Sequence, residues 1–178
     1  EYDYIMTHDD EAGYEKPIQK DPFEIIANQK EYIGAYDVGQ RLKNGHPHQG
    51  HKDTRVGLWE FTKNFLLQNN IKPSSKILQS LLEDPEAETR YHYIKWCDTY
   101  VIKTEVFKTS LWKKWINAVN ESGGIYKHRW GDNEIMTFFA YIIQQKIYNL
   151  DLVKTGFHNQ GMFRHIQNYA PSVKNSNL

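Results

Sequence analysis

Short apolar runs alternate along this chain with longer segments in which apolar residues recur every three or four positions. Residues 4–6 (Tyr-Ile-Met) form a run that is too short for a helix and is typical of a buried strand. Residues 32–38, 91–96 and 100–102 have the aromatic and β-branched composition of further strands. The alternation of strands with helical segments predicts an α/β domain.

The sequence predicts five helices, and several of them have residues that are typical of helix ends. Asp21 is placed to cap the first helix, Asp53 or Thr54 the second, and Asp132 the last. The double glycine at 123–124 predicts the end of the fourth. The expected helices cover approximately residues 22–29, 55–66, 74–83, 106–119 and 133–148.

The composition indicates a single domain without a general affinity for polyanions. The chain has 178 residues, 39% of them hydrophobic, which suffices for one core, and we expect residues 171–178 to form a flexible tail. Basic and acidic residues number 22 each, so nucleic acid is not an expected partner. No apolar run is long enough to predict a transmembrane segment.

Cysteine and histidine limit the kinds of metal site that the chain can form. Cys97 is the only cysteine, which excludes an internal disulfide and a multi-cysteine zinc site. So little cysteine favours a reducing compartment, and we expect a cytoplasmic protein. His46, His48 and His51 lie in a polar segment and fit either a zinc site or an ordinary surface loop.

Three acids follow the first apolar run, in the sequence His8-Asp9-Asp10-Glu11. In open α/β sheets, ligands bind where the strands leave the core. Adjacent carboxylates repel each other, so a packed cluster of them usually requires a cation. Asp9 and Asp10, with His8 beside them, therefore fit a Mg²⁺ or Mn²⁺ ion that holds a diphosphate, and they equally fit a solvated turn.

A second group of functional residue types lies at residues 123–132, directly before the last predicted helix. Arg129, Trp130 and Asp132 combine a cation, a flat apolar ring and an acid, which together suit the binding of a sugar phosphate and its hydroxyls. Asp132 also fits the simpler role of an N-cap that satisfies free backbone amides. Both roles are compatible with the pattern.

Taken in order from Tyr2 to about His165, these motifs resemble the fungal α-1,2-mannosyltransferase family of Golgi glycosyltransferases. That family has an acid cluster after a tyrosine-rich strand, a second strand, a Leu-Trp pair, an aromatic segment, and a double glycine followed by Arg-Trp-Gly-Asp. The matching segments here are residues 8–10, 32–38, 58–59, 91–96 and 123–132. The resemblance implies a GT-A-like nucleotide-diphospho-sugar transferase fold, in which helices flank a mixed sheet. It also implies GDP-mannose as the donor and Mn²⁺, or Mg²⁺, as the cofactor.

The resemblance also implies roles for individual residues. Asp10 and His158 match the positions of metal ligands, and Asp132 matches a position near the acceptor or the transferred sugar, where it would orient a hydroxyl or act as a base. The residues that it places in the substrate pocket are Asp9, Arg129, Trp130 and Gly131.

The chain departs from the family pattern at two positions. The family's Glu-Pro-Asp is His8-Asp9-Asp10 here, so a histidine replaces the first acid. Where the family has a glutamate near the anomeric carbon, this chain has Tyr100, and Asp98 is an alternative catalytic residue; Tyr100 also fits ordinary strand core. Because GT-A enzymes bind the nucleotide largely through the half that precedes the acid cluster, we expect that half to be missing or truncated.

The resemblance predicts a hexosyltransferase, which would move mannose or another hexose from a nucleotide sugar to a hydroxyl group of a glycan or glycoprotein. The alternative is a noncatalytic carbohydrate-binding or scaffold domain that has kept the fold after losing the acid at position 100. Binding of a nucleoside diphosphate together with Mn²⁺ would distinguish the enzyme from the scaffold.

Overall fold

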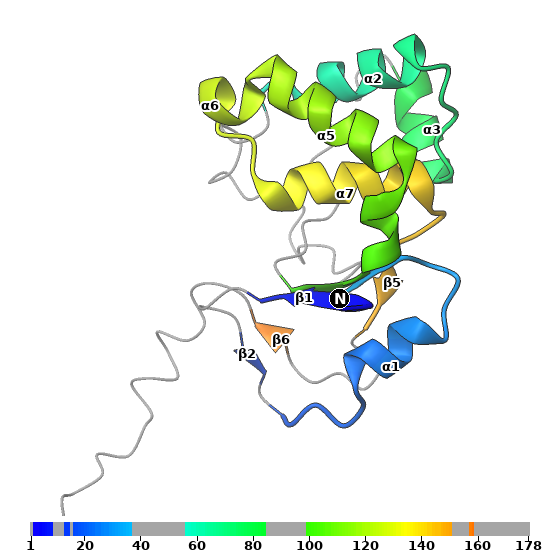
Figure 1. The fold of residues 1–178 in the computed structure, drawn as a ribbon, viewed down its shortest axis with the longest axis vertical. Helices are drawn as coiled ribbons and strands as arrows, with labels where there is room; N and C mark the ends of the chain where they lie inside the picture. The colour runs from blue at the N-terminus through cyan, green and yellow to red at the C-terminus, as the bar shows by residue number, and fades with distance from the viewer. Residues whose placement is uncertain are drawn as a thin grey trace, which may run out of the picture.

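A four-stranded mixed sheet lies at the centre of the part of the chain that the computed structural model describes, which comprises residues 2–8, 13–14, 16–36, 56–84, 99–150 and 157–158. The strand order is β1 (Tyr4–Thr7), β4 (Tyr100–Lys103), β3 (Ile33–Ala35) and β5 (Tyr148–Asn149). β4 is antiparallel to both of its neighbours, and β5 is parallel to β3. The expected α/β class, with helices flanking a mixed sheet, is confirmed (Figure 1).

β1 forms where the apolar run 4–6 predicts a strand, but it lies at the edge of the described sheet. Thr7 pairs with Tyr100, and Tyr4 pairs with Lys103 at the other end of the ladder. Tyr4 and Met6 pack against the smaller of two cores, whereas Ile5 is 43% exposed. The expectation of a buried strand is therefore wrong, because an edge position leaves part of the strand in contact with solvent.

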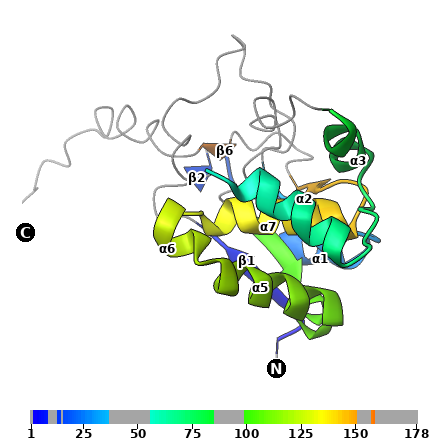
Figure 2. The ribbon, with the colours of Figure 1, turned by 90° about the horizontal axis from the view of Figure 1, so that it is seen from above.

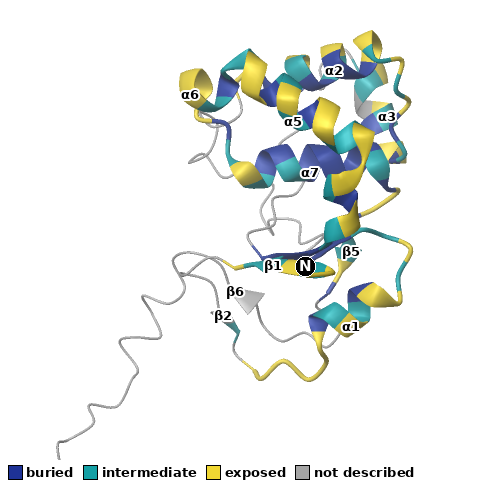
Figure 3. Ribbon diagram, in the orientation of Figure 1, coloured by how far each residue is buried: buried dark blue, intermediate teal, exposed yellow. Residues whose placement is uncertain are grey.

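One face of the sheet carries most of the helices, and α7 lies nearer to the sheet than α2 and α5 do (Figures 1 and 2). This position explains why eight of the twelve residues of α7 are buried, as the dark colour of this helix in Figure 3 shows. The elements on this face are α2 (Leu58–Gln68), α3 (Lys76–Glu83), the 3₁₀ helix η3 (Thr104–Lys108), α5 (Ser110–Ser122), α6 (Gly124–His128) and α7 (Asp132–Ile143).

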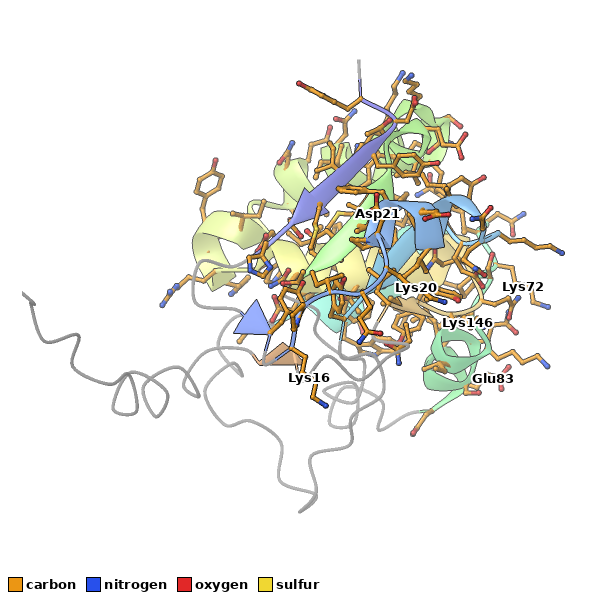
Figure 4. All side chains as sticks on the ribbon, turned by 90° about the horizontal axis from the view of Figure 1, so that it is seen from below. Lys16, Lys20, Asp21, Lys72, Glu83 and Lys146 are labelled. Carbon is orange, nitrogen blue, oxygen red and sulfur yellow. The ribbon has the colours of Figure 1, made fainter. Side chains whose placement is uncertain are left out.

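Within the described part of the chain, the opposite face carries a thinner layer, made of α1 (Pro22–Ala27), β2 (Gly13–Tyr14) and β6 (Phe157–His158) (Figure 1). A side chain on Gly34 of β3 would come within 3.0 Å of Ile26 of α1 and 3.1 Å of Leu150, so glycine permits this close approach. The exposed segment between β2 and α1 includes Lys16 and Lys20, which are visible from this side (Figure 4).

Two of the predicted helix starts are confirmed, and two are corrected. The Asp21 carboxylate accepts a hydrogen bond from Phe23 N at 2.8 Å and caps α1. The third helix follows the serine pair as expected. α2, however, begins after Gly57, which is in the left-handed conformation, so neither Asp53 nor Thr54 caps it. α5 begins after Thr109, because residues 104–108 form a 3₁₀ helix instead of its first turn.

α7 ends at Ile143, five residues before the predicted end, and the side chain of Gln144 explains why. Its Oε1 accepts hydrogen bonds from the backbone N–H groups of Tyr32 (3.0 Å) and Ile33 (3.1 Å). Its Nε2 donates to the backbone oxygens of Ile33 (2.9 Å) and Lys146 (2.7 Å). Gln144 has extended backbone angles and thus joins the end of the helix to the start of β3.

Candidate functional site

The end of β1 holds His8 in a defined position. His8 Nδ1 lies 3.0 Å from the hydroxyl oxygen of Thr99, a fully buried residue that directly precedes β4. The His8 ring stacks on the ring of Tyr14 in β2, with 5.8 Å between centroids and 12° between planes. His8 itself remains exposed. Two elements therefore fix an accessible imidazole immediately before the acidic segment of residues 9–11.

β2 and β6 bring a distant part of the chain to the same place. Gly13 pairs with His158, and Tyr14 pairs with Phe157, in an antiparallel two-stranded sheet. Through Tyr14, this small sheet contacts both His8 and Tyr36, the residue that follows β3. The segment that contains His158 therefore lies beside the end of β1, although about 150 residues separate them in the sequence.

The second group of predicted site residues lies between α6 and α7. Gly123, in the left-handed conformation, ends α5 as predicted, and the following residues form the short helix α6. Arg129 then reverses the chain with φ 52° and ψ 39°, a conformation that is costly for a non-glycine residue. Its side chain is exposed.

Trp130 occupies a core position. It is only 6% exposed, its Nε1 donates a hydrogen bond to the backbone oxygen of Val56 at 2.7 Å, and its ring contacts Phe61 and His128. Its ring also lies against Gly124, where a Cβ would overlap it. This environment gives Trp130 a structural role, namely holding the loop before α7 against α2. Its place in the substrate pocket stays a prediction.

The start of α7 carries two acids. Gly131 is the N-cap and Asp132 is the first residue of the helix, so the prediction that Asp132 is the N-cap is wrong. Asp132 is exposed, whereas Glu134 is 6% exposed with its carboxylate against Gly131. Both acids are favourably placed near the positive end of the helix dipole. The exposed carboxylate of Asp132 is therefore available to a substrate.

The structure places several of the other predicted residues, but not all of them. Tyr100 is 5% exposed in the central strand β4, which is consistent with a core residue. Asp9, Asp10 and Asp98, like the histidines at 46, 48 and 51 and the tail at 171–178, lie outside the described residues. The end of β1 and the start of α7 lie on the same side of the molecule in two perpendicular views (Figures 1 and 2).

Sequence reasoning missed two features of this region. It did not identify Thr99 as the anchor of His8, because no sequence pattern links positions 91 residues apart. It also did not identify the buried acid Glu134, although glutamate in the third position of a helix is a known feature of helix starts.

A divalent cation fits the chemistry of the residues at the end of β1. Imidazole and carboxylate groups are both acceptable ligands for Mn²⁺. The Thr7 hydroxyl, also at this end, is buried and has no hydrogen-bond partner among the described residues, which is costly unless a further polar group reaches it. Within the described ranges no three histidine, cysteine, aspartate or glutamate residues form a metal-binding cluster.

The chain matches a family of glycosyltransferases. Residues 47–169, more than half of the chain, match the family described as glycolipid 2-alpha-mannosyltransferase, and the chain belongs to this family. The resemblance that the motifs predicted is thereby confirmed.

Individual relatives agree with this assignment. The probable mannosyltransferase KTR3 of Saccharomyces cerevisiae is 22% identical over 162 residues, which cover 89% of this chain and 37% of that protein. Two X-ray structures of the mannosyltransferase Ktr4p from S. cerevisiae share the fold, with TM-scores of 0.59 for the complex with GDP and 0.62 for the other structure. Their identities are 17% and 18%, over 89% of this chain and 40% and 41% of theirs.

The chain thus spans about two fifths of the length of these relatives. None of the described helices is both long and apolar enough to cross a membrane.

Proposed function

We propose that the chain is a metal-dependent hexosyltransferase, which transfers mannose from a nucleotide-diphosphate sugar to a hydroxyl group of a glycan or glycoprotein. The observation that carries this proposal is the family match over residues 47–169. The complex of Ktr4p with GDP supports a guanine nucleotide as the leaving group. Mannose is the favoured sugar because the family and both named relatives are described as mannosyltransferases.

In this proposal, Asp10 and His158 hold the divalent cation. Asp10 precedes Gly13 by three residues, and Gly13 pairs with His158, which supports a common site. When bound, the cation stabilises the negative charge of the leaving diphosphate. Asp9 would contribute to the same diphosphate pocket as a substrate-binding residue.

The residues before and at the start of α7 would act on the sugar and the acceptor. The bond between the anomeric carbon and the diphosphate oxygen breaks, and the diphosphate leaves with the electron pair. The acceptor oxygen forms the new bond to this carbon, and its proton passes to the carboxylate of Asp132, which acts as the base. Arg129 and Gly131 shape the pocket, and Trp130 supports it from the core.

Tyr100 and Asp98 are the two candidates for the position near the anomeric carbon. Burial of Tyr100 within β4 favours a packing role for its side chain. We therefore assign the position to Asp98 and expect Tyr100→Phe to retain turnover.

Thermal unfolding with added nucleotide provides the first test. A ligand at one hundred times its dissociation constant stabilises the folded state by about 2.7 kcal/mol. For a domain of this size that amounts to a rise in Tm of roughly 5–10 °C. We expect this rise with GDP plus Mn²⁺, and not with GDP plus a chelator. The absence of any rise with GDP or UDP would support the noncatalytic scaffold instead.

Transfer from GDP-mannose to a mannoside then tests the role of Asp132. Loss of a general base typically lowers the rate by 10²–10⁴-fold. We expect Asp132→Asn to lose turnover to this extent while it keeps the stabilisation by GDP and Mn²⁺. Glu121→Gln, which changes an exposed acid on α5, is the matched control. Turnover of Asp132→Asn close to that of the control would refute the assignment.

A further inference from the structure

His8 is a histidine whose two ring nitrogens have different surroundings. Nδ1 lies 3.0 Å from the Thr99 hydroxyl oxygen, and the ring stacks on that of Tyr14, with 5.8 Å between the centroids. Among the residues that the structure describes, none pairs with Nε2. Because Thr99 is fully buried while His8 is exposed, the anchor is rigid and the imidazole is accessible.

This arrangement is the one that prepares a histidine to bind a metal. Histidine ligands usually donate their other ring N–H to an oxygen, and this second hydrogen bond fixes the tautomer and the ring orientation. If Nδ1–H donates to the Thr99 oxygen, the lone pair of Nε2 remains available for a cation. The stacking on Tyr14 further restricts the orientation of the ring.

The position of His8 adds a second argument. His8 directly precedes Asp9 and Asp10, and Tyr14, on which it stacks, belongs to the sheet that pairs Gly13 with His158. It also stands where the resembled pattern has the first acid of its Glu-Pro-Asp. His8, which can coordinate a cation, is therefore held at the position where the resembled pattern has a carboxylate.

We propose that His8 binds the divalent cation of this site through Nε2, with Thr99 as the residue that positions it. The inference rests on the proposed function, because it concerns the same cation. A neutral imidazole in place of a carboxylate lowers the negative charge of the site. It therefore shifts the preference of the site from Mg²⁺, which favours oxygen ligands, towards Mn²⁺.

Titration with Mn²⁺ at a fixed concentration of GDP, followed by electron paramagnetic resonance of the free ion, tests the proposal without any activity measurement. His8→Ala should weaken Mn²⁺ binding by at least 10-fold. Thr99→Val removes the hydroxyl but keeps the shape of the side chain. It should weaken Mn²⁺ binding by about 10-fold, the smallest loss that is typical when a metal ligand loses its hydrogen-bond partner. His8→Glu should restore binding and bind Mg²⁺ more tightly than the unaltered chain does.

His128→Ala is the matched control, because His128 is also exposed and also stacks on an aromatic ring, that of Trp130. Its Mn²⁺ affinity should equal that of the unaltered chain. The melting temperature of each variant in a chelator shows whether it is folded. If the melting temperature shows that His8→Ala is not folded, the Mn²⁺ affinities of Thr99→Val and His8→Glu test the proposal instead.

Electron spin echo modulation from ¹⁴N provides a direct test of the bond. In His158→Ala, the modulation of bound Mn²⁺ by imidazole nitrogen should persist and should disappear when His8 is also replaced. Folded His8→Ala could bind Mn²⁺ with an affinity within twofold of the control while Asp10→Ala loses Mn²⁺ binding. That result would overturn the role of His8 and leave the proposed function standing. Failure of the unaltered chain to bind Mn²⁺ would overturn the metal dependence in the proposed function and this inference with it.

Discussion

Replacing Gln144 by leucine should destabilise the domain severely. The change keeps a side chain of similar volume but removes all four hydrogen bonds between this residue and the backbone. Two of these bonds involve buried groups, the N–H and the oxygen of Ile33. The other two partners, in Tyr32 and Lys146, are only partly buried, so water can replace the lost bonds.

The expected magnitude follows from the two buried groups. A buried backbone group that loses its partner costs about 1–3 kcal/mol, so Gln144→Leu should lower the free energy of unfolding by about 4 kcal/mol. The total stability of a domain is about 5–15 kcal/mol, so the loss is a large fraction of it. Gln144→Glu should also be destabilising, because it keeps the acceptor for the two N–H groups but places a carboxylate oxygen against the oxygen of Ile33.

Urea unfolding followed by circular dichroism measures this difference. Gln145→Leu is the matched control, because Gln145 is adjacent and exposed, and it should change the free energy of unfolding by less than about 0.5 kcal/mol. If Gln144→Leu were as stable as this control to within 1 kcal/mol, the account of how α7 ends would be refuted.

Two further substitutions test the packing around α5 and α6. Gly124→Ala places a methyl group into the ring of Trp130 and should cost about 1–3 kcal/mol, measured as a fall in Tm; an unchanged Tm would show that Trp130 is not packed there. Thr109→Ala removes the cap that accepts from Trp112 N at 3.1 Å and should cost about 1 kcal/mol in urea unfolding. Thr109→Ser keeps the cap, and equal stability of these two variants at position 109 would argue against its contribution.

The parts of the fold that could be predicted from the sequence are those with a local cause. The Asp21 cap, the stop at Gly123 and the apolar face of α2 each depend on residues within one or two helical turns. The strands 4–7 and 100–103 were likewise marked by their apolar composition. The family motifs extended this information to the fold class.

The remaining features depend on contacts between distant residues. The apolar spacing of α7 continues towards Tyr148, but the hydrogen bonds of Gln144 with β3, 111 residues away, end the helix earlier. Trp130 resembles a ligand-binding aromatic residue in sequence, and its burial depends on Phe61 and Val56. For the candidate site, local patterns predict the acids and the histidine as candidate ligands, whereas the contact between His8 and Thr99 becomes visible only in the folded chain.

The unequal thickness of the two layers has a consequence for how the molecule responds to ligands. Among the residues that the structure describes, the core on the side of α1 contains four buried apolar residues, whereas the core under α7 contains many more. Regions with few buried contacts open locally at a lower cost than the rest of a protein. A cation held between the end of β1 and the β2–β6 pair would fasten the thinner layer to the sheet. Saturation of the site should therefore slow amide exchange in Tyr14 and its neighbours more than in α5, so that occupancy and local rigidity rise together.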